Sequence, residues 1–223
     1  MSTPDGSRFD DRRRDNASLD EELIEDVPEG SAFADFRLVP ESEVRLHVPL
    51  DMKYGAVGIR LLPHLTTRNA EIFGFPFPPK EDVSVVKVPP GASLSVFSWM
   101  GAMIRVWGPP EWLMDNPYRT DGFFTKLVAE VHCVLHASRE TAQAARVPGP
   151  RVVICGGPGT GKKTVVTTLA NYAARLGWAA TVVDADPDHQ SITAPTAIAA
   201  ASWQFPASPV EGPLHFETVA FAT

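Results

Sequence analysis

The chain has 223 residues and a formal net charge of −7, with 44% hydrophobic and 21% charged residues. These fractions are close to the globular average, so a wholly disordered protein is excluded, and the length suffices for one large domain or two small ones. No run approaches the ~18 consecutive apolar residues of a membrane span, and the N-terminus lacks the apolar core of a signal peptide. We therefore expect a protein that stays inside the cell and has no membrane contact, and its two cysteines fit a reducing compartment.

Residues 1–30 carry most of the net charge, because they hold ten acidic residues and four arginines among few apolar side chains. Such a segment cannot bury enough surface to offset the entropy of ordering, so we expect a disordered acidic tail over residues 1–30. Arg12, Arg13 and Arg14 could belong to a nuclear import signal, but the flanking acids favour a solvated charge run. The nearly neutral remainder disfavours broad nonspecific binding of nucleic acid and is compatible with a local basic groove.

Short alternating apolar runs extend from Phe36 to about Gly108, separated by proline and glycine. A period of two with frequent turn residues predicts a small antiparallel β-sandwich, which we bound at residues 31–118. The expected strands contain Val44, Leu46 and Val48; Val57, Ile59 and Leu61; Ile72 and Phe73; Val83 and Val85; Leu94 and Val96; and Ile104 and Val106.

Residues 123–145 place apolar side chains at helical spacing, which predicts a helix between the two halves of the chain. The first six residues, FFTKLV, fit a last strand equally well. Within this segment His132, Cys133 and His136 have the spacing of metal ligands on one helix face. The zinc-protease pattern needs Glu where Cys133 stands and no third ligand is near, so we interpret all three as ordinary helix residues.

A glycine-rich loop follows the β-branched run Val152–Ile154 and precedes a segment with helical periodicity that closes at Gly177. The order strand, Gly-x4-Gly-Lys loop and helix predicts a phosphate-binding loop. Glycines let successive backbone amides converge on phosphate oxygens, the helix N-terminus contributes partial positive charge, and the lysine reaches the outer phosphates. The candidate binding residues are Gly156, Gly157, Pro158, Gly159, Thr160, Gly161, Lys162, Lys163 and Thr164.

One position departs from this motif: the loop lysine is usually followed by Ser or Thr, whose hydroxyl ligates Mg²⁺, whereas here Lys163 follows it. An ammonium group repels a divalent cation by about 4 kcal/mol per pair of unit charges at ~4 Å and an effective dielectric constant of 20. Either Lys163 points away or Mg²⁺ binding suffers. A slipped motif that used Lys163 and Thr164 would put Lys162 where glycine is required.

A second strand of the same sheet is expected over residues 180–186, where an apolar run ends in Asp184 and Asp186. Acids at the end of such a parallel strand form the Walker B partner of the metal, which makes Asp186 a candidate metal ligand and, with Lys162, a candidate catalytic residue. Val152–Ile154 and Thr218–Phe221 are the other expected strands of this incomplete parallel sheet. A calcium loop is excluded because His189 replaces the glycine that it needs.

From about residue 36 to 223 the chain resembles the eukaryotic family of the pre-mRNA cleavage complex II subunit that is also an RNA 5′-hydroxyl kinase, the Clp cleavage and polyadenylation factor. Besides the loop, the stretches that match in order are Phe36–Leu38, Glu43–Leu46, Ala70–Gly74, Val96–Gly101, Gly149–Val152, Leu169–Gly177, and Asp186-Pro with Pro195 nine residues on.

This resemblance implies a mixed fold, in which an N-terminal antiparallel β-sandwich packs on an incomplete α/β P-loop (Walker) kinase domain over residues 119–223. It implies ATP between the two domains, with Glu43 matching the acid that approaches the adenine. It also implies a nuclear location, the other subunits of the cleavage and polyadenylation complex as partners, and RNA as a candidate ligand.

The departures from the family favour weak catalysis. This chain has Asp186-Pro-Asp-His where the family often has Asp-x-Gly-Gln, and the family's kinase domain continues further, with a Thr-x-Gly-Trp clasp and an arginine-bearing lid. We therefore expect an ATP-binding subunit of the 3′-end processing machinery with little or no kinase activity. The alternatives are an active polynucleotide 5′-hydroxyl kinase and an incomplete gene product without independent activity.

Overall fold

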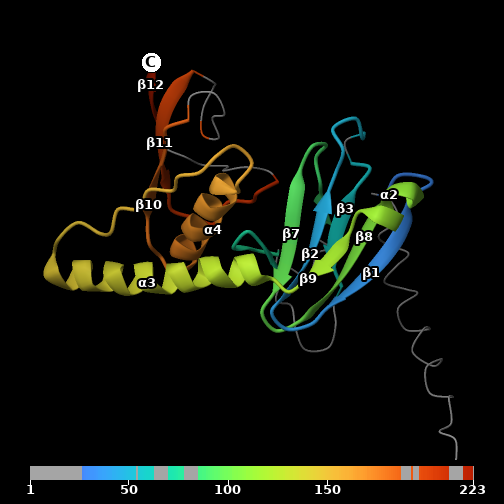
Figure 1. Cartoon of the computed structure of the whole chain (residues 1–223), viewed down its shortest axis with the longest axis horizontal. Coiled ribbons are helices and arrows are strands. Elements are labelled where there is room, and N and C mark those ends of the chain that lie inside the picture. The colour runs from blue at the N-terminus through green and yellow to red at the C-terminus, as the bar shows by residue number, and fades with distance from the viewer. Residues whose placement is uncertain are drawn as a thin grey trace, which may run out of the picture.

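The computed structural model describes residues 27–53, 55–62, 70–77, 85–186, 192, 196–210 and 218–222. An N-terminal β-sandwich is followed by a long helix and then by the P-loop domain (Figure 1). Most of the expected acidic tail lies outside the described residues. Within the described ranges no helix is both long enough and apolar enough to cross a membrane.

The sandwich consists of two sheets whose neighbouring strands are all antiparallel. The four-stranded sheet has the order β1 (Ala32–Leu38), β8 (Ala102–Gly108), β3 (Gly58–Leu61) and β6 (Val85–Lys87). The five-stranded sheet has the order β5 (Phe75–Pro76), β4 (Ala70–Ile72), β7 (Ser93–Ser98), β2 (Ser42–His47) and β9 (Tyr118–Thr120). The predicted sandwich is confirmed, while Val83 lies outside the described residues.

The core of the sandwich is formed by the alternating apolar side chains that the sequence singled out. Val44 of β2, Val96 of β7 and Ile104 of β8 have no exposed surface. Each such burial contributes about 1.5–3 kcal/mol relative to an exposed side chain. A short helix, α2 (Pro110–Asp115), adds Trp112, whose Nε1 donates to the His47 carbonyl at 2.9 Å.

The connection from the sandwich to the second half is the helix α3 (Phe123–Ala145). Its first residues are helical, which decides the open choice between strand and helix, and the last strand of the sandwich is β9, just before them. Gly122 joins the two with φ 63°, and a Cβ there would lie 2.4 Å from the Phe97 ring, so this tight turn requires glycine. Figure 1 shows α3 leaving the sandwich, running beside α4 and extending past it.

The second half contains α4 (Lys162–Arg175), β10 (Ala180–Asp184), β11 (Ala197–Trp203) and β12 (Thr218–Ala222). The helix expected after the loop is confirmed, and the strand expected over residues 180–186 is present as β10, which ends at Asp184. The buried side of α4 spans Thr168–Ala174, and it packs Ala170 and Ala174 against Trp203 and Ala207.

Two expectations for this half are wrong. Val152–Ile154 is not a strand: its backbone is irregular, and Val152 and Val153 are exposed. The three strands of the second half pair antiparallel in the order β10, β11, β12, not parallel. The physical reason is the connection between β10 and β11: only twelve residues, 185–196, lie between them, which is about the minimum for the crossover that parallel neighbours need, whereas antiparallel neighbours need no crossover.

Candidate functional site

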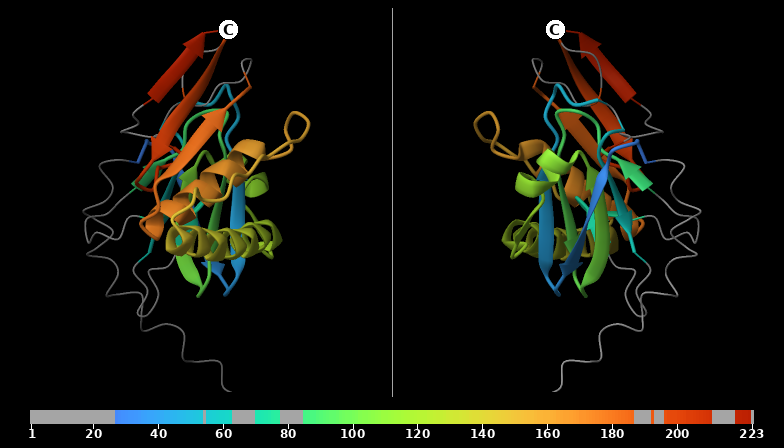
Figure 2. Two further views of the ribbon diagram at one scale, coloured as in Figure 1. Left: turned by 90° about the vertical axis from the view of Figure 1, so that its left-hand side faces the viewer. Right: turned by 90° about the vertical axis from the view of Figure 1, so that its right-hand side faces the viewer.

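The glycine-rich loop before α4 protrudes from the body of the protein (Figure 2). Gly159 and Gly161 have φ values of 71° and 82°, a left-handed conformation that glycine adopts without strain. Gly161 is the N-cap of α4, and the first helical hydrogen bond runs from the Val165 N–H to the Gly161 carbonyl. The amides before Val165 therefore lie at the positive end of the helix dipole, where an anion is favoured.

Lys162 folds back into its own loop. Its Nζ donates to the Gly156 carbonyl at 2.9 Å and to the Gly157 carbonyl at 2.8 Å. The Thr160 hydroxyl also donates to the Gly157 carbonyl, at 2.8 Å. These bonds hold the ammonium group over the loop, where it can reach a phosphate bound by the backbone amides.

The residues around the loop fit phosphates better than they fit Mg²⁺. Lys163 is exposed in the first turn of α4, at the position of the usual hydroxyl ligand, and an ammonium group cannot ligate a cation. Asp184 ends β10, and its Oδ1 accepts the Asp186 N–H at 3.1 Å. Within the described residues, no group of three His, Cys, Asp or Glu side chains comes together. The candidate cation ligands are therefore the two acids of the sequence motif, Asp184 and Asp186.

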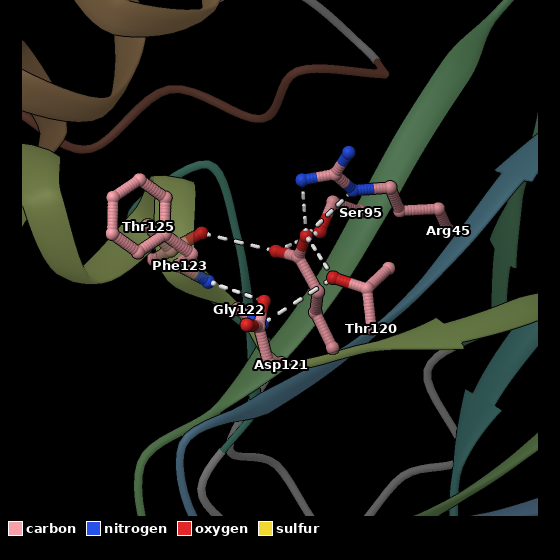
Figure 3. Close-up of polar contacts among 8 residues, drawn as sticks. Arg45, Ser95, Thr120, Asp121, Gly122, Phe123 and Thr125 are labelled. Carbon is pink, nitrogen blue, oxygen red and sulfur yellow. Dashed lines mark hydrogen bonds and ion pairs between the residues drawn. The ribbon is translucent and has the colours of Figure 1, made fainter.

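Glu43 lies inside the protein, with no exposed surface. Its Oε1 accepts the Arg45 Nε at 2.6 Å, and its Oε2 accepts the Ser95 hydroxyl at 2.6 Å and the Thr125 hydroxyl at 3.1 Å (Figure 3). The Thr120 hydroxyl is 3.4 Å from Oε1. The carboxylate predicted to approach the adenine is thus surrounded by donors from β2, β7, β9 and α3.

A second buried carboxylate, Glu71 of β4, was missed by the sequence reasoning. It is 4% exposed, its Oε1 accepts a short hydrogen bond from the Tyr172 hydroxyl, and its Oε2 accepts the Arg175 Nη1 at 2.6 Å. Burial and the neighbouring Glu71 carboxylate raise the pKa of Tyr172, so this hydroxyl stays protonated and donates. Glu71 and its two partners all lie in stretches that match the family, but no sequence pattern indicates that the stretches meet.

Asn171 completes the contact between α4 and the rest of the protein. Its amide nitrogen donates to the Phe73 carbonyl at 2.9 Å and to the Ala207 carbonyl at 3.1 Å. Its amide oxygen accepts the Trp203 Nε1 at 3.0 Å and the Ala207 N–H at 2.8 Å. Both donors and both lone pairs of the side chain are therefore used, and one residue connects α4 to the sandwich and to β11.

The two histidines of α3 pack against the region around α4. The His132 ring centroid is 5.3 Å from that of Tyr172, and the His136 Nδ1 accepts the Trp178 Nε1 at 3.1 Å. Burial, with the nearby charges of Arg139, His136 and Arg175, lowers the pKa of His132 to about 4. His132 is therefore neutral at physiological pH and belongs to the packing between α3 and α4.

Family models match both halves of the chain. The model for the N-terminal β-sandwich domain of polyadenylation factor matches residues 37–142, and the model for the P-loop of mRNA cleavage and polyadenylation factor CLP1 matches residues 156–222. The chain belongs to the CLP1 family. The family membership expected from the sequence is thus confirmed, as is the order of a β-sandwich followed by a P-loop domain.

Relatives of this CLP1-family chain come from plants and animals. It is 34% identical over 195 residues to a protein CLP1 homolog of Arabidopsis thaliana, which is 83% of this chain and 40% of that protein. It is 30% identical to the polyribonucleotide 5′-hydroxyl-kinase Clp1 of Danio rerio, over 87% of this chain and 41% of that protein. The human protein of the same name is 31% identical over 79% of this chain and 38% of its own length.

Solved structures share the fold. The wild-type Clp1p–Pcf11p complex contains a chain that superposes on this one with a TM-score of 0.64 at 18% sequence identity, over 86% of this chain and 44% of the other. A second structure, of an extended interface between Pcf11p and Clp1p, gives a TM-score of 0.63 with the same identity and coverage. The chain thus spans about two fifths of the length of the curated relatives that it matches.

Proposed function

We propose that this chain is a nuclear, ATP-binding subunit of the pre-mRNA 3′-end cleavage and polyadenylation machinery, with little or no kinase activity of its own. The observation that carries the proposal is the loop before α4. It combines glycines at positive φ, an exposed helix N-terminus and Lys162 held over the loop, which together fit the phosphates of a nucleotide. The family of the chain supports the processing role.

In this proposal the loop binds the phosphates and Lys162 exchanges its contacts with the Gly156 and Gly157 carbonyls for a phosphate oxygen. Asp186 is the proposed ligand of Mg²⁺, and Lys163 weakens the binding of that ion because it adds positive charge where a hydroxyl is usual. Mg²⁺, when bound, would neutralise phosphate charge. The remaining proposed binding residues are Pro158, Gly159, Thr160, Gly161 and Thr164.

Glu43 enters the proposal with a condition. An adenine contact through its side chain requires that the carboxylate give up one of its donors, because all of its surface is buried. The least costly exchange is at Thr120, whose hydroxyl makes the longest of the four contacts. In the proposed adenine contact, the Glu43 carboxylate therefore exchanges the Thr120 hydroxyl for the adenine.

The partners that we propose are the other subunits of the cleavage and polyadenylation complex, with RNA as a further ligand. Two solved neighbours contain Clp1p together with Pcf11p, and one of them concerns ATP loss in a point mutant. A Pcf11-type subunit is therefore the first partner to test. We further propose a division of the chain into a sandwich over residues 31–118 and a P-loop domain over 119–223, although β9 continues to Thr120.

Calorimetric titration with ATP tests the proposed function. The wild-type chain should bind, and Lys162→Ala should lose roughly 1.5–3 kcal/mol of binding free energy, because a charge-assisted phosphate contact disappears. Lys163→Ala is the matched control, since it removes an adjacent ammonium group that the proposal gives no phosphate. Equal losses in the two variants would support the slipped motif, and no binding by the wild type would overturn the proposal.

An active RNA 5′-hydroxyl kinase is the second candidate, and the names of the Danio rerio and human relatives favour it. Phosphoryl transfer requires positioned cations and a closed site around the transferred group. The loop holds one cation, Lys162, but it is exposed rather than closed, and Lys163 stands where a ligand of the metal ion is usual. We expect no transfer of radiolabelled phosphate from ATP to RNA with a 5′-hydroxyl end, and transfer that Lys162→Ala abolishes would establish the kinase instead.

A further inference from the structure

Three residues of the five-stranded sheet form a row that reaches the first turn of α3 at one end and the C-terminal half of α4 at the other. Glu43 of β2 and Glu71 of β4 each lie opposite Phe97 of β7 in the strand register. Directly opposed residues in neighbouring strands point to the same face of a sheet. Both carboxylates therefore project from one face, where Glu43 contacts α3 through Thr125 and Glu71 contacts α4 through Tyr172.

The contact between α4 and β4 is close as well as polar. Gly74, at the turn between β4 and β5, has φ 75°, and a Cβ there would lie 3.0 Å from the Thr168 carbonyl and 3.1 Å from the Asn171 Cβ. The Gly74 carbonyl also accepts the Arg175 Nη1 at 3.3 Å. The corner of the sandwich thus leaves room for the helix backbone and for no additional side chain.

The two ends of α4 differ in burial. All of its buried residues lie between Thr168 and Ala174, whereas Lys162 and Lys163 of the first turn are half-buried and exposed. Lys162 and Tyr172 are ten residues apart, which is about 15 Å along a helix. Because a helix of this length is stiff, a change in tilt at Tyr172 moves the first turn and the loop before it.

We propose that Glu71 is a positioning residue for the phosphate-binding loop. It fixes α4 through Tyr172 and Arg175, so the affinity of the loop for ATP depends on a carboxylate of the sandwich that does not touch the nucleotide. This inference rests on the proposed function, since it concerns nucleotide binding by the same loop.

The chemistry of this contact suits a positioning role. Apolar contacts have no preferred direction, so two apolar surfaces can slide slightly against each other. A carboxylate with one hydrogen bond on each oxygen is directional, so it fixes the position of both donors. A buried ion pair contributes little net stability, so its value lies in geometry. Arg175 also stacks on Tyr172, with its Cζ 5.6 Å from the ring centroid, which keeps the two donors together.

The test compares two variants that each remove one carboxylate from an arginine pair. Glu71→Gln keeps the size of the side chain and removes its charge beneath α4. Asp35→Asn is the matched control, because the Asp35 Oδ1 accepts the Arg105 Nε at 2.7 Å in the other sheet of the sandwich. We expect Glu71→Gln to weaken ATP binding about three- to tenfold in calorimetry, which lies within the roughly two- to thirtyfold range of coupling seen for residues remote from a ligand, while Asp35→Asn leaves it unchanged.

Hydrogen exchange supplies a readout that a purely structural role would not move and that needs no ATP. In the folded protein, Glu71→Gln should speed amide exchange in residues 165–168, where the helical hydrogen bonds of α4 begin, more than Asp35→Asn does. Unchanged ATP affinity and unchanged exchange in that turn, with a lower melting temperature, would overturn the inference. If the wild type does not bind ATP the proposed function fails, and the exchange experiment still decides the positioning role.

Tyr172→Phe tests the same contact from the side of α4 if Glu71→Gln does not fold. It removes only the hydroxyl that donates to Glu71 and leaves the ring packed against His132. The expected effects on ATP affinity and on exchange have the same direction as those of Glu71→Gln. A folded Tyr172→Phe protein that binds ATP as the wild type does would overturn the role of this contact.

Discussion

The sandwich and the P-loop half bury different kinds of side chain. The sandwich core consists of large aliphatic and aromatic residues contributed by both sheets, whereas the described core beside α4 is built mainly from alanines around Trp203. The sandwich therefore has an apolar core within itself, and α4 is fixed largely by polar contacts to its neighbours. Apolar burial can stabilise a domain alone, whereas directional bonds make one part of a chain depend on the position of another.

The largest expected effect is a cavity in the sandwich core. Ile104→Ala removes a fully buried side chain and should lower the free energy of unfolding by about 2–5 kcal/mol in urea titrations. Val153→Ala is the control from the other half, because Val153 is 84% exposed and surface changes stay within about 0.5 kcal/mol. Similar losses in the two variants would contradict the contrast between the halves.

The next effect concerns the polar contacts of α4. Asn171→Ala removes the side chain that accepts the Ala207 N–H and donates to the Phe73 carbonyl. We expect a loss of about 2–4 kcal/mol in the free energy of unfolding, since each stranded buried group costs about 1–3 kcal/mol. Gln204→Ala is the control, because that amide donates to the Ser202 hydroxyl at 3.2 Å in an exposed position. A stable Asn171→Ala protein would show that α4 is held by apolar contacts after all.

A pH effect of intermediate size should come from His132. Its pKa is about 4 in the folded protein and about 6.5 ordinarily, so the unfolded chain takes up the proton more readily. The stability is fully present above pH 6.5 and is lost as the pH falls toward 4, by about 1–3 kcal/mol.

Melting temperatures across that pH range measure this effect. His132→Gln should flatten the decline, whereas His47→Gln should not, because His47 is exposed and bonds Ser93 at 2.9 Å. An unchanged decline in His132→Gln would assign the pH dependence to other groups.

The smallest expected effect is at the metal position. Lys163→Ser should tighten the binding of ATP with Mg²⁺ relative to ATP with a chelator, by about 0.5–1 kcal/mol, because the lysine is exposed and its repulsion is screened. Kinase turnover should remain undetectable. Tighter binding of ATP without Mg²⁺ would show instead that Lys163 interferes with the phosphates.

The sequence was sufficient to predict those elements whose structure follows from a local pattern of residues. The alternation through Val44 and Val96 predicted buried strands, and the loop before Lys162 predicted the start of α4. It failed for Val152–Ile154, a β-branched run that pairs with no strand in the described part of the chain, since strand formation depends on pairing. The alanine-rich β11 was also missed, because alanine has low β propensity.

The candidate site shows the same division between local and distant information. Residues that are close in the sequence, such as Gly156 and Lys162, are brought together by the local turn of the chain. Glu71 and Tyr172 are 101 residues apart, and the pairing of a carboxylate with one hydroxyl among many leaves no trace in a single sequence. The burial of Glu43 could not be predicted either, because its donors come from four separate elements.

The row of Glu43, Phe97 and Glu71 also fixes the distance between the two points at which the sheet contacts α3 and α4. With one strand between them, the backbones of Glu43 and Glu71 are separated by two inter-strand distances, about 9.5 Å. Two packed helices prefer an interaxial distance of about 8–10 Å, nearly the same length. A sheet of regular strands can therefore hold α3 and α4 at their natural separation with one acidic residue for each helix. A designer who moves this pair of helices to another sheet should keep the two acids two strands apart.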